Sequence, residues 1–380
     1  MPPCAGKSLA MPRGSGAAAT GQTRGPGLSN PSWPGAILRC DGHGAGRGRA
    51  TVAQQDEPAP PSRHALIVLG MHRSGTSVLT RFVGALGAAL PADPNPAAAD
   101  NPEGYHEPAG LVMVHDALLR AADSAWFDTR PFDLFALPPA VLKAIAARMQ
   151  AALQVSFAEA PCFVVKDPRS CRFVPLLRDV LAGLGARASA VLALREPAEV
   201  AASLGHRDGI SPRYAGLLWA RHMIDAELAT RDLPRTMVSY DELLVGWRGV
   251  AARVVALAPL AAPPADEAEI LGILRPDLRH HAGLAAESLF GPGLATALGR
   301  LHAALLGLAT RDEAAERAAV DAAAAPLLAA ANRVQDAVEA EFMIQRLTSP
   351  HPHIASTQPE EDRRRFAAAM QRLHAVADGA

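Results

Sequence analysis

Residues Leu66–Ser77 read LIVLGMHRSGTS and decide the fold more than any other stretch of this 380-residue chain. Four apolar residues run into Gly70, and a second glycine, Gly75, follows five positions later. Short continuous apolar runs are typical of strands that are buried on both faces. The stretch therefore predicts a buried strand, a tight glycine-bounded loop and then a helix.

A strand–loop–helix turn of this kind collects backbone N–H groups around one point, beside the positive end of a helix dipole. The turn therefore predicts a site for a phosphate-like anion, and an ordinary tight turn with an exposed arginine is the alternative. The candidate binding residues are His72, Arg73, Ser74, Gly75, Thr76 and Ser77.

The turn differs from a Walker A loop at one position. The two glycines and Ser77 have the Walker spacing, but Thr76 stands where the phosphate-binding lysine belongs, and Arg73 is the nearby cation. A P-loop kinase or NTPase stays an alternative, in which Asp167 after the apolar run 162–165 would hold magnesium. A catalytically idle binding protein on the same fold is the other alternative.

A second cluster follows the apolar run 188–194, which predicts another buried strand. Arg195 ends that strand, and Ser203 lies two turns into the helix that we expect from Pro197. Ligands of open α/β sheets bind outside the carboxyl ends of the strands, and an arginine fork suits phosphate. The alternative is that Arg195 makes a surface ion pair with a neighbour such as Glu199.

These residues resemble the sulfotransferases that use 3′-phosphoadenosine-5′-phosphosulfate, in particular the bacterial branch often described as sulfotransferase family proteins. The resemblance spans about residues 64–290 and rests on six ordered matches. Besides the loop and the R-x-P-x-x-x-x-x-S pattern of Arg195–Ser203, they are Asn101–Glu107 (NPEGYHE), Lys166–Arg169 (KDPR), Tyr240–Leu244 (YDELL) and Asp277–His280 (DLRH).

The resemblance implies a function and a donor. It implies transfer of a sulfuryl group to an acceptor hydroxyl or amine, with the 5′-phosphosulfate on residues 72–77 and no metal. It also implies that Arg195 and Ser203 bind the 3′-phosphate.

The resemblance also implies which residues catalyse the transfer. It makes Glu107 the general base, with the adjacent His106 in reserve, and charge complementarity at a helix start is the alternative for Glu107. Arg73 would hold the developing negative charge. Lys166 could reach the departing oxygen or the acceptor, or else make a local ion pair with the neighbours of Asp167. His72 is expected to position the backbone or to face the acceptor.

The alternation of apolar runs and helical stretches predicts an α/β fold. We expect a P-loop-like three-layer domain over 63–290, with a central parallel sheet covered by helices on both faces. The expected strands are 65–69, 162–166, 188–194 and 236–240. The expected helices are 75–90, 108–122, 138–158, 172–184, 197–204, 212–230 and 242–257. Residues 291–380 are Ala-rich and predict a helical C-terminal extension.

Composition limits the remaining possibilities. Residues 1–62 are rich in Gly, Pro, Ala and Ser without apolar periodicity, which predicts a disordered segment. The net charge of −1 gives no electrostatic case for nucleic acid, and no apolar run predicts a membrane span. Four cysteines without metal-ligand spacing favour a reducing compartment, so we expect a cytoplasmic protein.

The sequence says least about partners. The loops 91–135 and 204–216 are expected to line the acceptor pocket. Their mixed Asp, Arg and His content fits a carbohydrate, a lipid-linked sugar or other lipid, a small alcohol or a peptide. The Ala-rich C-terminal helices could pack on the domain or form a homo-oligomer with a second copy.

Overall fold

The computed structural model describes residues 62–378, except 99–100, 261–265, 276, 278, 280, 334, 351–353 and 356–357. All but the last residue of the segment predicted to be disordered, 1–62, lies outside these described residues, as do Cys4 and Cys40. Cys162 and Cys171 are free cysteines, and both are buried in the way that small apolar residues are.

A four-stranded parallel sheet forms the centre of the molecule, in the order β2-β1-β3-β4. The strands are β1 (Arg63–Leu69), β2 (Cys162–Lys166), β3 (Ala186–Leu194) and β4 (Arg235–Ser239). All four strands expected from the apolar runs are confirmed, with ends that shift by one or two residues. β1 and β3 lie side by side at the centre, so the two candidate anion-binding segments leave neighbouring strands.

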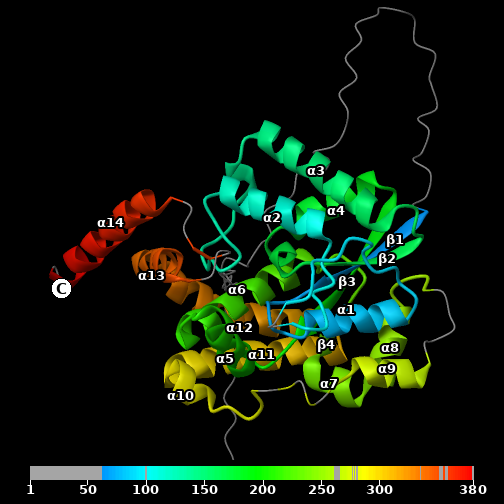
Figure 1. Cartoon of the computed structure of the whole chain (residues 1–380). Helices are drawn as coiled ribbons and strands as arrows, with labels where there is room; N and C mark the ends of the chain where they lie inside the picture. The colour runs from blue at the N-terminus through cyan, green and yellow to red at the C-terminus, as the bar shows by residue number, and fades with distance from the viewer. Residues whose placement is uncertain are drawn as a thin grey trace, which may run out of the picture.

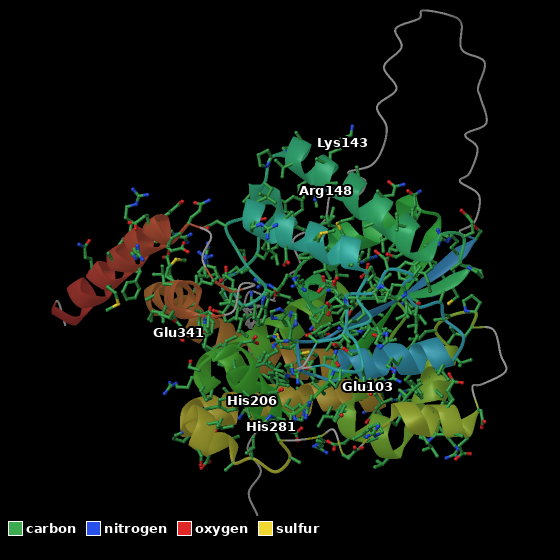
Figure 2. All side chains as sticks on the ribbon, viewed as in Figure 1. Glu103, Lys143, Arg148, His206, His281 and Glu341 are labelled. Carbon is green, nitrogen blue, oxygen red and sulfur yellow. The ribbon has the colours of Figure 1, made fainter. Side chains whose placement is uncertain are left out.

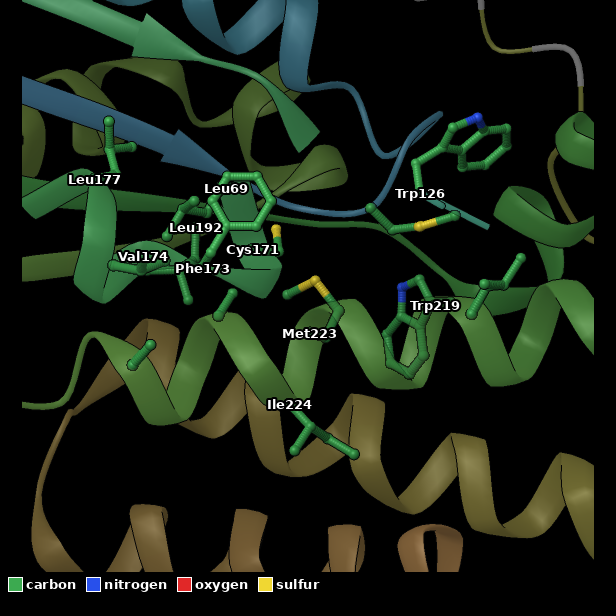
Figure 3. Packing of buried hydrophobic residues seen from close by; sticks show 14 of the residues in the cluster. Leu69, Trp126, Cys171, Phe173, Val174, Leu177, Leu192, Trp219, Met223 and Ile224 are labelled. Carbon is green, nitrogen blue, oxygen red and sulfur yellow. The ribbon is translucent and has the colours of Figure 1, made fainter. Parts of the chain in front are cut away.

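Side chains of the strands alternate between two apolar cores. Ile67 and Leu69 of β1 face one core, while Leu66 and Val68 face the other. Figure 3 shows the first core, where Leu69 of β1 and Leu192 of β3 lie above side chains of α6 such as Met223. The sheet is therefore covered on both faces, and the predicted three-layer α/β fold is confirmed (Figure 1).

Helices on the two faces come from different parts of the chain. The smaller core is covered by α1 (Thr76–Ala85), α7 (Tyr240–Val245), α8 (Trp247–Val255) and α9 (Glu267–Ile273). The larger core is covered by α2 (Ala109–Ala121), α3 (Pro139–Phe157), α4 (Val174–Gly183), α5 (Pro197–Asp208), α6 (Pro212–Ala229) and α10 (Ala286–Phe290).

Four expected helices differ from the structure by two or more residues, and one of them, expected over 197–204, continues to Asp208. The helix expected over 242–257 is two helices, because the chain leaves helical geometry at Gly246. The helix expected over 75–90 ends at Ala85. The helix expected from residue 172 starts at Val174, after a 3-10 turn η2 (Pro168–Arg172) that Asp167 caps by accepting from the N–H of Arg169. That turn carries the KDPR segment to the end of β2.

The C-terminal residues form four helices, α11 (Pro292–Thr310), α12 (Ala314–Arg333), α13 (Gln335–Thr348) and α14 (Pro359–Asp378). Buried residues of α11–α13, such as Leu301, Val320 and Phe342, belong to the same core as the larger face of the sheet. α14 lies along α13 at the edge of the molecule (Figure 1), and a buried ion pair joins Arg346 to Asp362.

Candidate active site

One large pocket lies beyond the carboxyl ends of all four strands. Its volume is 1120 Å³, and its wall includes residues that directly follow β1, β2, β3 and β4. This is where ligands of open parallel sheets bind. From the predicted sites the pocket wall contains His72, Arg73, Gly75, Thr76, Ser77, Glu107, Lys166, Arg195 and Ser203.

The anion loop, residues 70–77, takes a backbone path that its glycines permit. Gly70 and Gly75 have φ values of 149° and 83°, which side-chain-bearing residues rarely adopt. A Cβ at Gly70 would lie 2.7 Å from the carbonyl oxygen of Ala193, and one at Gly75 would lie 2.5 Å from the Tyr240 ring. Arg73 is left-handed as well, at 69°. The loop thus packs closely on β3 and on Tyr240.

The loop ends at the N-terminus of α1, which has neither a side-chain cap nor an acidic residue in its first turn. The first N–H groups of a helix have no partner within it, so this end suits an anion. The hydroxyl-bearing residues Thr76 and Ser77 line the pocket. Ser74 does not: its side chain is buried behind the loop, and its Oγ has no partner within the described residues.

The second cluster meets the anion loop directly. A guanidinium nitrogen, Nη1, of Arg195 donates to the carbonyl oxygen of Arg73 at 3.0 Å. Nε of Arg73 in turn donates to Oγ of Ser203 at 2.8 Å. Arg195 also lies over the ring of Tyr240, 4.6 Å from its centroid. Two segments separated by some 120 residues therefore form one side of the pocket.

Arg195 lies beside the anion loop and also makes the ion pair with Glu199 that was expected as the alternative. Nε of Arg195 donates to Glu199 Oε2 at 2.8 Å, while Arg279 donates to Glu199 Oε1 at 2.5 Å. Burial raises the pKa of Glu199, but the hydrogen bonds from Arg279 and Arg195 outweigh it and hold the pKa below its usual value. Glu199 thus fixes Arg195 beside the anion loop without removing it from the pocket wall.

Lys166 supplies the lysine that the anion loop lacks, in addition to Arg73 within the loop. Its Nζ lies 3.3 Å from Ser77 Oγ, 3.0 Å from the carbonyl oxygen of Tyr105 and 2.6 Å from Glu107 Oε1. Both side chains of the Lys166–Glu107 pair are nearly inaccessible to solvent, at 2% and 6%. Glu107 Oε2 also accepts from Asn95. The local ion pair expected as the alternative for Lys166 is formed, but with Glu107.

The two candidate histidines lie in different settings. His106 is not in the pocket wall, and its Nε2 is 3.0 Å from the carbonyl oxygen of Glu103. Its φ of 54° is unusual for a histidine. His72 lines the pocket and contacts Trp126 at 4.5 Å between ring centroids. Burial, with the positive charges of Arg169 and Arg207, holds the pKa of His72 well below its usual value.

A buried network under the KDPR segment was not predicted from the sequence. His115 of α2 and Asp167 are 2.7 Å apart, both fully buried, and Asp167 also accepts from Arg169. Asp167 is not in the pocket wall, whereas Arg169 is. The positive charge of Arg169 and the hydrogen bond with His115 outweigh burial and lower the pKa of Asp167. Asp167 therefore holds η2 against α2 rather than facing a ligand.

Part of the remaining wall of the pocket comes from the two segments expected to line it, 91–135 and 204–216, and part from Ile273, Arg275 and His281, which lie outside them. Residues between 95 and 126 contribute, as do His206 and Arg207, and His206 lies near His281, with ring centroids 6.4 Å apart (Figure 2). Seven lining side chains are arginine or lysine and two are glutamate. Most of these cations have a carboxylate partner, such as Asp208 for Arg207 and Glu103 for Arg81.

Two further observations concern metals and membranes. In the described part of the chain, no group of three or more His, Cys, Asp or Glu side chains could hold a metal ion. None of the described helices combines the length and apolar character needed to cross a bilayer.

Comparisons with known proteins found distant structural likeness only. No protein-family model and no curated protein sequence matches the chain. Among solved structures, it is similar to the sulfotransferase domain from the curacin biosynthetic pathway, with 16% identity, a TM-score of 0.34, and coverage of 58% of this chain and 81% of that one. It is also similar to the sulfotransferase domain from the Synechococcus PCC 7002 olefin synthase, with 17% identity, a TM-score of 0.36, and coverage of 68% and 97%. Likeness at this level is weak, so the function must be argued from the pocket itself.

Proposed function

We propose that this protein is a sulfotransferase that uses 3′-phosphoadenosine-5′-phosphosulfate as its donor. The observation that carries the proposal is the meeting of two anion-binding clusters in one pocket. Arg195 and Ser203 are bonded to Arg73 of the anion loop, and all three line the same 1120 Å³ cavity. A donor with phosphate groups at both the 3′ and 5′ positions of one ribose needs two such neighbouring clusters.

The 5′ end of the donor would lie on the anion loop. The uncapped N-terminus of α1 and the hydroxyls of Thr76 and Ser77 suit a phosphosulfate there. The 3′-phosphate would lie on Arg195 and Ser203, where a planar guanidinium suits phosphate oxygens. This assignment needs no metal ion.

Sulfuryl transfer moves negative charge onto the oxygen that bridges the donor's phosphorus and sulfur. The S–O bond to that oxygen breaks while a bond to the acceptor oxygen forms, so adenosine 3′,5′-bisphosphate leaves. Lys166, 3.3 Å from Ser77 Oγ, is the buried cation closest to that end of the anion loop. Removing one preorganised donor to such a charge typically costs about 3–4 kcal/mol of barrier.

The acceptor hydroxyl must lose its proton as the new bond forms. Glu107 lines the pocket, and its ion pair with Lys166 places a carboxylate beside the same end of the anion loop. We propose that Glu107 is the general base that takes up this proton. His106 does not line the pocket, so its role as reserve base is the weaker assignment.

The magnesium-dependent kinase or NTPase is a poorer account of the same pocket. Its magnesium ligand would be Asp167, but that carboxylate is fully buried and is bonded to His115 and Arg169. Its loop lysine would be at position 76, which is threonine. The second cluster, Arg195 and Ser203, has no role in that reaction.

Ligand-induced stabilisation separates the candidate functions. We expect adenosine 3′,5′-bisphosphate to raise the melting temperature, and ATP with magnesium to raise it less at the same concentration. A ligand at 100 times its Kd adds about 2.7 kcal/mol of stability. Stabilisation by ATP with magnesium alone would favour a kinase, and stabilisation by neither compound would favour an idle protein.

The acceptor is the least constrained part of the proposal. A carbohydrate, a lipid, a small alcohol or a peptide each fits the mixed polar and aromatic wall formed by Asn95, Asn101, Tyr105 and Trp126. A screen of such acceptors with sulfur-labelled donor would identify the class. Cytoplasmic location and a homo-oligomer through the C-terminal helices remain predictions.

A further inference from the structure

The C-terminal helix α13 packs against a segment that reaches the pocket. Phe342 of α13 is fully buried, and its ring centroid lies 5.5 Å from that of Phe127. The guanidinium of Arg130 lies 4.6 Å from the centre of the same Phe342 ring. α13 therefore holds the segment Asp123–Arg130 at two places.

From Phe127 the contacts continue to the anion loop. Phe127 meets Trp126 edge to face, with centroids 5.4 Å apart, and Trp126 meets His72 at 4.5 Å. Phe342, Phe127, Trp126 and His72 thus form a continuous aromatic series, which runs from a helix near the C-terminus to the anion loop. Packed aromatic pairs of this kind contribute roughly 0.5–1.5 kcal/mol beyond the area that they bury.

Polar contacts fix the same segment on both sides. On the C-terminal side, Arg365 of α14 forms an ion pair with Asp123. On the sheet side, Arg172 of η2 donates to the carbonyl oxygens of Asp128 and Arg130, each at 2.6 Å. The segment has few ways to move unless α13 and α14 move with it.

We infer that α13 and α14 support the anion loop, with Phe342 as a positioning residue that acts through Phe127 and Trp126 on His72. The chain from 335 to 378 then has a role at the site, although none of the residues described there lines the pocket. A preorganised loop binds its anion more tightly because less ordering accompanies binding. The effect on ligand affinity rests on the proposed function, but the effect on loop mobility does not.

The first test is hydrogen exchange in the ligand-free protein. Phe342→Leu keeps an apolar side chain but removes the ring from the series. Met343→Leu is the matched control, because Met343 is the next residue of α13, is equally buried and contributes no ring to the series. We expect faster amide exchange over 71–77 and 123–130 in Phe342→Leu, and no change there in Met343→Leu.

The second test is the affinity for adenosine 3′,5′-bisphosphate. We expect Phe342→Leu to weaken binding about 3- to 10-fold, the size of effect that residues away from a ligand exert through packed neighbours. Met343→Leu should change it less than about twofold. If the effect passes through Trp126, the double variant Phe342→Leu/Trp126→Leu should bind within about twofold of Trp126→Leu alone.

The outcomes separate this inference from the proposed function. If the unaltered protein does not bind the bisphosphate, the proposed function fails, while the exchange test still decides the role of Phe342. If exchange over 71–77 is the same in Phe342→Leu and Met343→Leu, the inference is wrong. Additive effects of Phe342→Leu and Trp126→Leu on binding would also overturn it. Should Phe342→Leu not fold, Phe127→Leu removes the next ring of the series and gives the same test.

Discussion

The two halves of the pocket are built in different ways. The half that we propose for the donor, called the donor half, consists of the anion loop, Arg195 and Ser203, and it offers backbone N–H groups and an uncapped helix end. The acceptor half, around Glu107, Lys166 and Asn95, uses side chains whose charges already satisfy one another. Under the proposed function, the uncapped helix end of the donor half is open to an anion from outside, although Arg195 is paired with Glu199, whereas the acceptor half must exchange one of its own partners to react.

The largest expected effect is in the acceptor half. Glu107→Gln keeps an oxygen that can accept from Lys166 but loses the basic carboxylate. We expect turnover to fall about 10²- to 10⁴-fold with an acceptor found by screening. The affinity for adenosine 3′,5′-bisphosphate should stay within about twofold of the original. The measurement is transfer of label from donor to acceptor, and unchanged turnover would assign the base elsewhere.

The next effect tests how closely the donor half is packed. Gly75→Ala places a Cβ in left-handed geometry and against the Tyr240 ring, whereas Gly209→Ala places one in left-handed geometry with nothing within 4 Å. We expect Gly209→Ala to cost about 1–2 kcal/mol of unfolding free energy, and Gly75→Ala about 2–5 kcal/mol.

Chemical denaturation measures both costs. Binding of the bisphosphate should be lost only in Gly75→Ala, because Gly209 is not in the pocket wall. Equal costs in the two variants would mean that the anion loop can move away from Tyr240.

Arg195→Ala should affect the donor half alone. We expect bisphosphate binding to weaken about 10- to 100-fold, the range for hydrogen bonds to a charged group. Turnover at saturating donor should change much less, because the 3′-phosphate is remote from the transferred group. Arg178→Ala, which breaks an exposed pair with Asp232, is the matched control. Calorimetry on both variants measures the difference, and an equal loss of turnover and of affinity would contradict it.

The smallest effect concerns pH and compares His72 of the anion loop with His106, which lies outside the pocket wall. Burial, with Arg169 and Arg207, lowers the pKa of His72 well below 6.5, so the folded protein resists its protonation. The unfolded chain takes up that proton below pH 6.5, so the contribution of His72 to stability is lost as the pH falls from there. The expected slope is at most about 1.4 kcal/mol per pH unit.

Denaturation at several pH values between 7.5 and 5 measures this slope. His72→Gln should flatten it more than His106→Gln, because His106 is only partly buried although burial and Arg81 also lower its pKa. A slope that neither variant changes would mean that folding does not lower the pKa of His72.

The meeting of the anion loop with Arg195 and Ser203 could be predicted because each of these two segments is short and follows a strand, and the two strands are neighbours. The anion loop spans eight positions between a strand and a helix. Arg195 and Ser203 likewise lie at the end of the neighbouring strand and on the helix that follows it. Strand positions followed from apolar runs, whereas helix ends depended on local geometry such as the break at Gly246.

The rest of the site depends on partners that are distant in sequence. Glu107 and Lys166 are 59 positions apart, and His115 and Asp167 are 52 apart. No local pattern indicates which buried charges will pair, since pairing follows from how α2 and β2 pack. The contact of Phe342 with Phe127 could not be predicted either, because Ala-rich helical spacing does not indicate which surface a helix covers.

The central claim is that both clusters hold one ligand, and calorimetry on two nucleotides tests it most directly. The affinities of adenosine 3′,5′-bisphosphate and adenosine 5′-monophosphate are measured on the unaltered protein and on Arg195→Ala. We predict that loss of the 3′-phosphate weakens binding to the unaltered protein at least about tenfold, and binding to Arg195→Ala less than about threefold. Equal losses in the two proteins would show that Arg195 does not contact that phosphate, and would contradict the account.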